Sequence, residues 1–121
     1  MLSKADIITA IELFKDNAIV VVDEAYIEFS PEQTSTDLLA KYDNVIVLRT
    51  LSKAFGLAAI RCGFLLADSS VMSYISRLIA PYPIADPSAE IALKALSQDG
   101  LQTMKKQTDE LINVRHWFVS E

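Results

Sequence analysis

Four side chains of the types that carry out catalysis follow the ends of apolar segments in this sequence. Asp23 directly follows a run of four apolar residues, and Tyr26 comes three positions later. Lys53 lies five positions beyond a second apolar run, and Arg61 lies eight positions beyond Lys53. Ligands bind at the carboxyl ends of strands in open α/β sheets. We therefore expect an amine, an acid, a phenol and a guanidinium to meet at one edge of a sheet.

This combination matches the demands of pyridoxal 5'-phosphate (PLP) chemistry. A lysine amine holds the cofactor aldehyde as a Schiff base, and a carboxylate keeps the pyridine nitrogen protonated. A phenol donates to the ring oxygen beside the aldehyde, while hydroxyls, backbone N–H groups and an arginine fork hold the phosphate. Lys53 is thus the candidate catalytic residue, with Asp23 and Tyr26 beside the ring. The candidate phosphate ligands are Thr50, Ser52 and Arg61.

The elements that must position these residues form an α/β fold. The two apolar runs predict strands at 19–22 and 44–49, with a β-branched composition typical of strands covered on both faces. A short helix over 36–41 lies between them, which predicts a right-handed parallel βαβ unit. The connection 50–60 is too short for another parallel crossover. A third strand at 61–67 is therefore expected to be antiparallel.

Helices are expected to flank this mostly parallel, three-stranded sheet. Ser3 and Asp6 have the spacing of a capping box, which predicts a helix over residues 4–15. The second half is predicted to hold a helix from Asp68 or Ser69 to Ile79, one that begins at Asp86–Pro87 and ends at Gly100, and one from Leu101 onward.

The composition excludes several classes of protein. The chain has 121 residues, 51% of them hydrophobic, and a net charge of −5, which argues against nucleic-acid binding because that needs a basic surface. No apolar run approaches the roughly 18 residues of a membrane span. The single cysteine, Cys62, fits a reducing cytoplasm. Glu24 and Glu28 have no histidine or cysteine companions, so no metal site is expected.

Four stretches of the sequence are similar to a known enzyme family. The motifs are Val-Val-Asp-Glu-Ala-Tyr-Ile-Glu-Phe (21–29), Leu-Arg-Thr-Leu-Ser-Lys-Ala-Phe-Gly-Leu-Ala (48–58), Arg-Cys-Gly-Phe (61–64) and Ala-Pro-Tyr-Pro (80–83). They resemble histidinol-phosphate aminotransferases, which belong to the fold-type-I, class-II PLP-dependent aminotransferases. The resemblance covers essentially the whole chain, with one departure: family members commonly have glycine where Ala59 stands.

The resemblance implies a role for each motif residue. Lys53 would hold the cofactor and then act as acid and base in the 1,3-proton shift. Asp23 would pair with the pyridine nitrogen and Tyr26 with the ring 3-oxygen. Ser52 and Arg61 would hold the phosphate, with Thr50 a weaker candidate. The implied reaction converts histidinol phosphate and 2-oxoglutarate to imidazole-acetol phosphate and glutamate, in a homodimer.

Other parts of the family's site are expected outside residues 1–121. The family's glycine-containing phosphate loop, an asparagine near the ring and a tyrosine from the dimer partner belong upstream. An arginine that binds the substrate carboxylate belongs to a small domain downstream. The chain is thus expected to be the centre of the PLP-binding large domain, without an internal boundary. Such a fragment alone is expected not to transaminate.

Several alternatives remain open at this point. Another class-II PLP enzyme, such as an aromatic aminotransferase or a threonine-phosphate decarboxylase, shares these motifs. A nucleotide-binding α/β module is disfavoured because no glycine-rich phosphate motif follows a strand. A non-catalytic fragment that self-associates through apolar sheet edges is a third possibility. Thr50 and Ser52 could also serve local backbone groups alone. Tyr82, between two prolines, is interpreted as a packed ring in a rigid turn.

Overall fold

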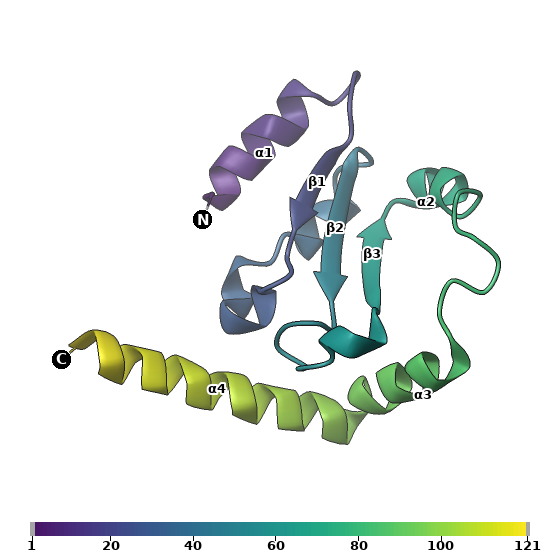
Figure 1. Cartoon of the computed structure of the whole chain (residues 1–121). Helices are drawn as coiled ribbons and strands as arrows, with labels where there is room; N and C mark the ends of the chain where they lie inside the picture. The colour runs from purple at the N-terminus through teal and green to yellow at the C-terminus, as the bar shows by residue number, and fades with distance from the viewer. Residues whose placement is uncertain (1, 121) are drawn as a thin grey trace.

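A three-stranded sheet lies at the centre of the molecule (Figure 1). A computed structural model describes residues 2–120 of the chain. The strands are β1 (Val20–Asp23), β2 (Val45–Thr50) and β3 (Gly63–Ala67), in the order β1-β2-β3. β1 runs parallel to β2, and β3 runs antiparallel to β2. Both predicted strand directions are confirmed.

The helix before the sheet begins where its capping residues predict. Helix α1 (Lys4–Leu13) is capped by Ser3, whose hydroxyl accepts from the Asp6 N–H while the Asp6 carboxylate accepts from the Ser3 N–H. It ends two residues before the predicted end. The expected short helix between β1 and β2 is the 3-10 helix η3 (Thr36–Ala40). Two further 3-10 turns, η1 (Ile27–Phe29) and η2 (Pro31–Gln33), precede it.

One face of the sheet holds the core. Ile11 of α1, Leu38 of η3 and the inward residues of β2, Val45 and Val47, pack together and are at most 1% exposed. Cover is incomplete on both faces: Val21 on the opposite face is 53% exposed, and Phe64 and Leu66 of β3, which pair with Arg49 and Val47 on the core face, are 38% and 36% exposed. The prediction that both strands would be covered on both faces is confirmed for the start of β2, where Val45, Ile46 and Val47 are all buried, and is wrong for β1. The β-branched run marks two apolar faces, of which α1 and η3 cover one.

Three helices form the second half of the chain: α2 (Ser69–Ile75), α3 (Asp86–Ala95) and α4 (Gln98–Ser120). Asp68 caps α2 as predicted, since its Oδ1 accepts from the Ser70 N–H at 2.8 Å. The helix ends at Ile75, earlier than predicted, and Leu78 beyond it is 85% exposed. The Pro81–Pro83 turn is also not packed as expected, because Tyr82 is 96% exposed with φ 58°.

Gly100 does not end a helix, contrary to the prediction. It lies in the first turn of α4, against the end of α3. A Cβ on Gly100 would lie 2.3 Å from the Ala95 carbonyl oxygen and 2.6 Å from that of Lys94. Glycine is needed here because the two helices approach closely, and not because the chain leaves the helix.

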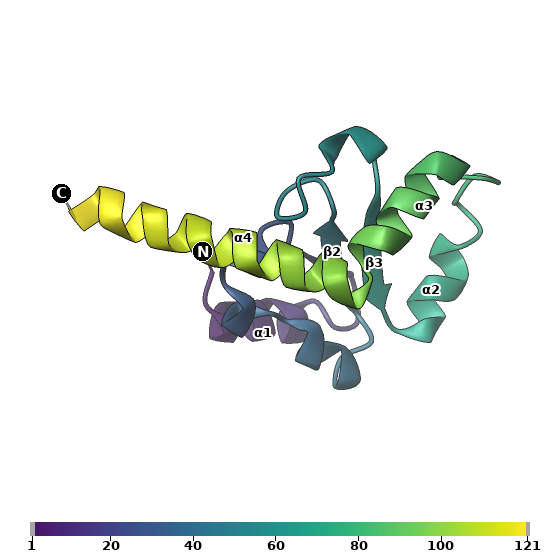
Figure 2. The ribbon, with the colours of Figure 1, turned by 90° about the horizontal axis from the view of Figure 1, so that it is seen from below.

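The helical half passes beneath the edge of the sheet where β1 and β2 end. Figure 2 shows α4 crossing under the sheet and extending beyond it, with α3 joined to it by a sharp bend. α4 lies against η1, and its Thr108 is 2% exposed there. The carboxyl ends of β1 and β2 therefore face a helix. No helix within residues 2–120 is both long and apolar enough to cross a bilayer.

Candidate active site

Lys53 lies in the loop that joins β2 to β3. Its Nζ lies 5.2 Å from the centroid of the Tyr26 ring, within range of a cation–π contact. The neighbours Leu51 and Ala54 are buried, at 0% and 8% exposure, and fix the loop beside the sheet. Gly56 has φ 66°, a left-handed conformation that glycine adopts without strain, and its N–H donates to the Lys53 carbonyl at 2.8 Å. The loop thus presents an exposed amine from a firmly held backbone.

Asp23 and Tyr26 come from the turn that ends β1. Asp23 pairs in register with Leu48, so its carboxylate stands at the carboxyl end of the parallel strands. Its Oδ1 accepts from the Ala25 N–H at 2.9 Å, which bends the chain toward Tyr26. The Tyr26 ring is 58% exposed and lies beneath the Lys53 amine. The predicted acid and phenol are thus on the same edge as the lysine.

The three predicted phosphate ligands have local contacts. Thr50 Oγ1 accepts from the Ser52 N–H at 3.1 Å and lies 3.4 Å from the Cys62 carbonyl oxygen, to which it donates. Ser52 is half-buried beside Lys53. Arg61 is exposed and left-handed, with φ 52°, and its Nη1 donates to the Ala58 carbonyl at 3.0 Å. The Arg61 guanidinium is therefore turned back onto its own loop in this structure.

Two hollows flank the Asp23 carboxylate. One, of about 570 Å³, is lined by Asp23, Thr50 and apolar residues of β3 and α2. The other, of about 450 Å³, lies between α1 and β1 and is lined by Asp23 and Tyr26. Lys53, Ser52 and Arg61 line neither of these two hollows. Lys53 thus lies beside Tyr26, and Asp23 and Thr50 line the same hollow. The Arg61 guanidinium points toward the Ala58 carbonyl and not toward these side chains.

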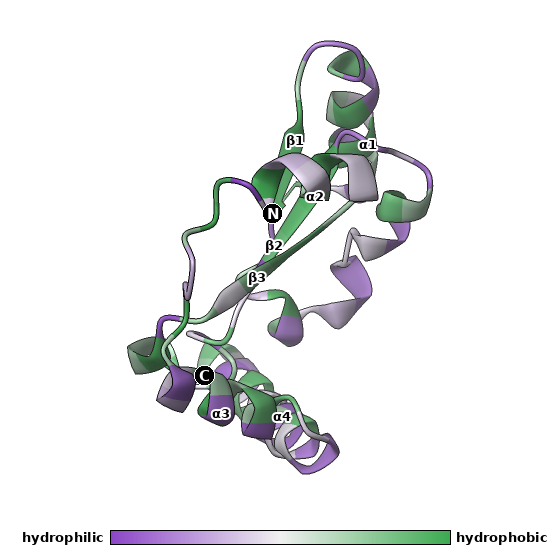
Figure 3. Ribbon diagram, turned by 90° about the vertical axis from the view of Figure 1, so that its right-hand side faces the viewer, coloured by the Kyte–Doolittle hydropathy of each residue, from purple (hydrophilic) through white to green (hydrophobic). Residues whose placement is uncertain are grey.

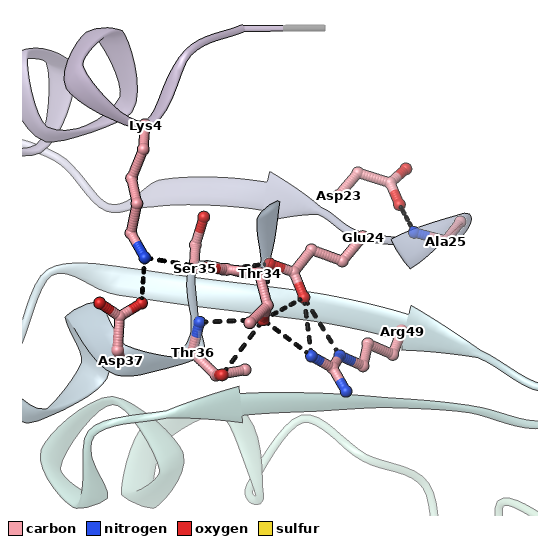
Figure 4. Close-up of polar contacts among 9 residues, drawn as sticks. All are labelled: Lys4, Asp23, Glu24, Ala25, Thr34, Ser35, Thr36, Asp37 and Arg49. Atoms are coloured by element: carbon pink, nitrogen blue, oxygen red, sulfur yellow. Dashed lines mark hydrogen bonds and ion pairs between the residues drawn. The ribbon is translucent and has the colours of Figure 1, made fainter. Parts of the chain in front are cut away.

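A buried polar network beside the site was not foreseen from the sequence. Glu24 follows Asp23, and its side chain is 4% exposed. The Arg49 guanidinium donates to Glu24 Oε2 through Nε at 3.1 Å and through Nη2 at 2.9 Å (Figure 4). Thr34 links the two by donating to Glu24 and accepting from Arg49 at 2.9 Å. The sequence contained information that could have predicted this pair. Glu24 follows Asp23 and Arg49 follows Leu48, so a parallel alignment that pairs Asp23 with Leu48 also puts Glu24 beside Arg49.

The family comparison decides between the classes of protein that remained open. The family of class I and II aminotransferases matches residues 1–121. The chain belongs to this family. In fold and in its motif residues it is therefore an aminotransferase-family chain, as the resemblance implied.

Curated relatives match this aminotransferase-family chain closely over part of their length. The histidinol-phosphate aminotransferase of Vibrio parahaemolyticus is 51% identical over 111 residues, which is 92% of this chain and 32% of that protein. That of Aeromonas hydrophila is 52% identical over 92% of this chain and 31% of its own length. The chain thus spans about a third of the length of the curated relatives that it matches.

Solved structures share the fold of the chain. The histidinol-phosphate aminotransferase from Clostridium acetobutylicum has a TM-score of 0.75 and 22% identity, over 89% of this chain and 32% of that one. A decarboxylase from Sulfurospirillum multivorans has a TM-score of 0.77 and 24% identity, over 97% of this chain and 35% of that one. The predicted α/β architecture is confirmed as part of the fold-type-I architecture.

The side chains at this edge fit PLP by their chemistry. An exposed amine above a phenol ring, a carboxylate at a strand end and two hydroxyls supply the groups that the cofactor needs. A hollow of about 570 Å³ beside Asp23 and Thr50 has the size of a small-molecule site, for which roughly 300–1,000 Å³ is usual. Within residues 2–120, no cluster of three or more His, Cys, Asp or Glu side chains offers a metal site instead.

Proposed function

We propose that the whole protein is a PLP-dependent aminotransferase that transfers the amino group of histidinol phosphate to 2-oxoglutarate in histidine biosynthesis. The identity of 51–52% to curated histidinol-phosphate aminotransferases supports this choice of substrates. The observation that carries the proposed reaction is the Lys53 amine above the Tyr26 ring, on the edge that carries Asp23. An amine, a phenol and a carboxylate at one edge are the groups that transamination requires.

Each proposed role follows from the chemistry of the side chain. When bound, PLP supplies an electron sink for the charge left on the substrate carbon. The Lys53 amine would hold the cofactor and then act as the acid and base of the reaction, which its flexible stem permits. The Asp23 carboxylate would keep the pyridine nitrogen protonated, and the Tyr26 hydroxyl would donate to the ring oxygen. The phosphate would be held by Thr50, Ser52 and Arg61.

The assembly and its location belong to the same proposal. We place residues 1–121 in the cofactor-binding large domain of a cytoplasmic homodimer with soluble amino-donor and 2-oxo-acid substrates. The coverage of about a third of each curated relative supports the placement within a larger domain. The chain alone is then expected not to transaminate, because it spans only about a third of the curated relatives.

The fold by itself does not select the reaction. A decarboxylase and an aminotransferase resemble the chain about equally in structure, with TM-scores of 0.77 and 0.75. Decarboxylation of threonine phosphate and transamination of aromatic amino acids therefore remain the alternatives to be assayed. The sequence identity to the curated relatives is what favours histidinol phosphate.

The proposal is tested by fixing PLP covalently to its lysine and by assaying turnover of the candidate substrates with the same preparation. The whole protein is incubated with PLP and reduced with borohydride, and peptide mass spectrometry then locates the pyridoxyl group. We expect it on Lys53, and we expect Lys53→Ala to lose the label and at least about 10³-fold in turnover. Lys41→Ala, which removes another exposed lysine, is the control and should change neither.

Two results would overturn the proposal. One is a label on other lysines or on none, and the other is turnover of threonine phosphate or an aromatic amino acid in preference to histidinol phosphate. Light scattering of the same preparation tests the homodimer, and a monomer with full activity would contradict it.

A further inference from the structure

The buried Glu24 carboxylate connects the ends of two strands. Both of its oxygens accept hydrogen bonds: Oε2 from Arg49, at 2.9 and 3.1 Å, and Oε1 from the Ser35 N–H, at 2.5 Å. The Thr34 hydroxyl donates to the same carboxylate at 3.1 Å. Arg49 in turn donates to Thr34. Glu24, Arg49 and Thr34 thus form a closed set of charge-assisted bonds, which are shorter and stronger than neutral ones.

The two charged residues of this network are each adjacent in sequence to a candidate site residue. Glu24 follows Asp23, and Arg49 precedes Thr50. Successive residues of a strand point to opposite faces, so Asp23 is directed away from Glu24, as Figure 4 shows. The Glu24 N–H also donates to the Leu48 carbonyl at 2.9 Å, which extends the parallel ladder by one residue. The network therefore fixes the two strand ends from the face opposite the cofactor groups.

The middle of the sheet is held by apolar packing away from the network. The core residues Val45 and Val47 of β2 pack against Ile11 and Leu38 nearer the middle of the sheet. A buried ion pair adds little net stability compared with apolar residues of the same shape. The Glu24–Arg49 pair is nevertheless buried, with side chains 4% and 24% exposed, while the Lys4–Asp37 pair in the same half is 41% and 55% exposed. Its position at the strand ends indicates a geometric role.

We propose that Glu24, Arg49 and Thr34 are positioning residues that set the spacing between the Asp23–Tyr26 turn and the Thr50–Lys53 loop. The inference rests on the proposed function, because it assigns those two segments to opposite sides of one cofactor ring. With the network intact, the Asp23 carboxylate and the Lys53 amine keep a fixed separation. Without it, only the backbone ladder that ends at the Glu24 N–H holds the end of β1 against the end of β2, and the side chains there lose their fixed spacing.

A displacement of about 1 Å at a catalytic group costs about 10²-fold in rate. We therefore expect Glu24→Gln and Thr34→Val to lower kcat by about 10- to 100-fold while KM for histidinol phosphate changes little. The absorption of bound PLP reports on protonation of the C=N bond to the lysine, which is sensitive to the position of a carboxylate at the ring nitrogen, so its pH midpoint should shift in the same variants. Thr34→Ser keeps the hydroxyl and should restore kcat and the spectrum to within about 3-fold of wild type.

Two controls separate positioning from folding in the whole protein. Asp37→Asn breaks the exposed Lys4–Asp37 pair and should leave kcat and the spectrum unchanged. Val22→Ala removes part of the apolar packing of β1 and should lower the unfolding midpoint without moving the pH midpoint of the spectrum. All kinetic and spectral measurements are made below the unfolding transition of each variant.

The outcomes distinguish this inference from the proposed function. Failure of wild type to fix PLP on Lys53 contradicts the proposed function and, with it, this inference. Normal labelling of wild type, with unchanged kcat and spectrum in Thr34→Val, overturns the positioning role alone. A spectral shift in Val22→Ala as large as that in Thr34→Val would also overturn it, because any loosening of the sheet would then suffice. Since Thr34→Val is nearly isosteric with the native residue and Thr34→Ser removes only a methyl group, the test does not depend on Glu24→Gln folding.

Discussion

The two halves of the chain are packed very differently. In residues 3–67, α1 and η3 enclose an apolar core against one face of the sheet. Among the described residues from 68 onward, only Ala92 and Thr108 are buried, while Leu93 and Phe118 are 73% and 76% exposed. Figure 3 shows the same contrast: the strands are mostly hydrophobic, whereas α3 and α4 alternate between hydrophobic and hydrophilic residues.

This difference shows which part of the chain sets the geometry of the site. All six candidate site residues belong to the packed half. The strand ends that carry them are fixed by the core below and by the Glu24–Arg49 pair beside them. Within residues 2–120, the helical half lies under those ends without a core of its own.

The largest expected difference between the halves is the effect of a leucine truncation. Leu38→Ala removes a side chain that is 1% exposed in the core and should lower the free energy of unfolding by about 3 kcal/mol. Leu111→Ala, at 58% exposure on α4, should change it by less than about 0.5 kcal/mol. Urea unfolding followed by circular dichroism measures both. Equal losses would show that the helical half is as tightly packed as the sheet.

Truncating a buried asparagine should also lower the free energy of unfolding more than truncating an exposed one, but by less than the leucine truncation. Asn44 is 7% exposed, and its Nδ2 donates to the Ile11 carbonyl at 2.9 Å, which ties the end of α1 to the start of β2. Asn44→Ala should cost about 1–3 kcal/mol, because it leaves a buried carbonyl unsatisfied. Asn113→Ala, on the exposed surface of α4, is the matched control and should be neutral or slightly stabilising. A neutral Asn44→Ala would mean that water replaces the lost bond.

Gly100→Ala tests the one tight contact within the helical half. The added Cβ would lie 2.3 Å from the Ala95 carbonyl oxygen, so the junction of α3 and α4 must open. Overpacking costs roughly 1–3 kcal/mol, against a gain of about 1 kcal/mol in helix propensity. We expect faster amide exchange around residues 97–101 and an unchanged exchange rate in β2. Faster exchange in both regions would show that the halves unfold as one unit.

The smallest expected difference between the two halves is in how their stability falls at low pH. Hydrogen bonds from Ser3 lower the pKa of Asp6 below its ordinary 3.8, and hydrogen bonds from Ser70 do the same for the pKa of Asp68. A carboxyl whose pKa is lowered by folding stabilises the fold above its unfolded pKa and loses this contribution as pH falls through the folded value. Asp6→Asn should therefore flatten the fall in global stability below about pH 4, whereas Asp68→Asn should flatten only the loss of protection in α2. Urea unfolding and amide exchange at several pH values check each. An effect of Asp68→Asn on global unfolding would contradict the division into halves.

Local patterns predicted most of the packed half. The β-branched runs placed β1 and β2 to within one or two residues, and the short connection after Thr50 fixed the antiparallel direction of β3. The capping box at Ser3 predicted the start of α1 because it needs only residues three apart. The turn after β1, in which the Ala25 N–H donates to Asp23, was not predicted.

Features that depend on contacts between distant segments could not be predicted in the same way. The partner of Glu24 depends on strand register, and the reason for Gly100 depends on the approach of α4 to α3. The direction of the Arg61 guanidinium depends on a long side chain in an exposed loop with a left-handed backbone. Whether all six candidate residues hold one cofactor stays a prediction.

The loop between β2 and β3 has a consequence for how such a protein tolerates change in chain length. Its two ends are clamped by the Thr50–Gly63 pair and by the Leu51 N–H, which donates to the Cys62 carbonyl at 3.1 Å. An inserted or deleted residue at the exposed Ala58 or Ala59 would leave the strand pairing and the buried Leu51 in place. The same change would shift the Lys53 amine relative to the Arg61 guanidinium. On the proposed function, an insertion or deletion at this point should therefore give a folded protein that has lost its activity.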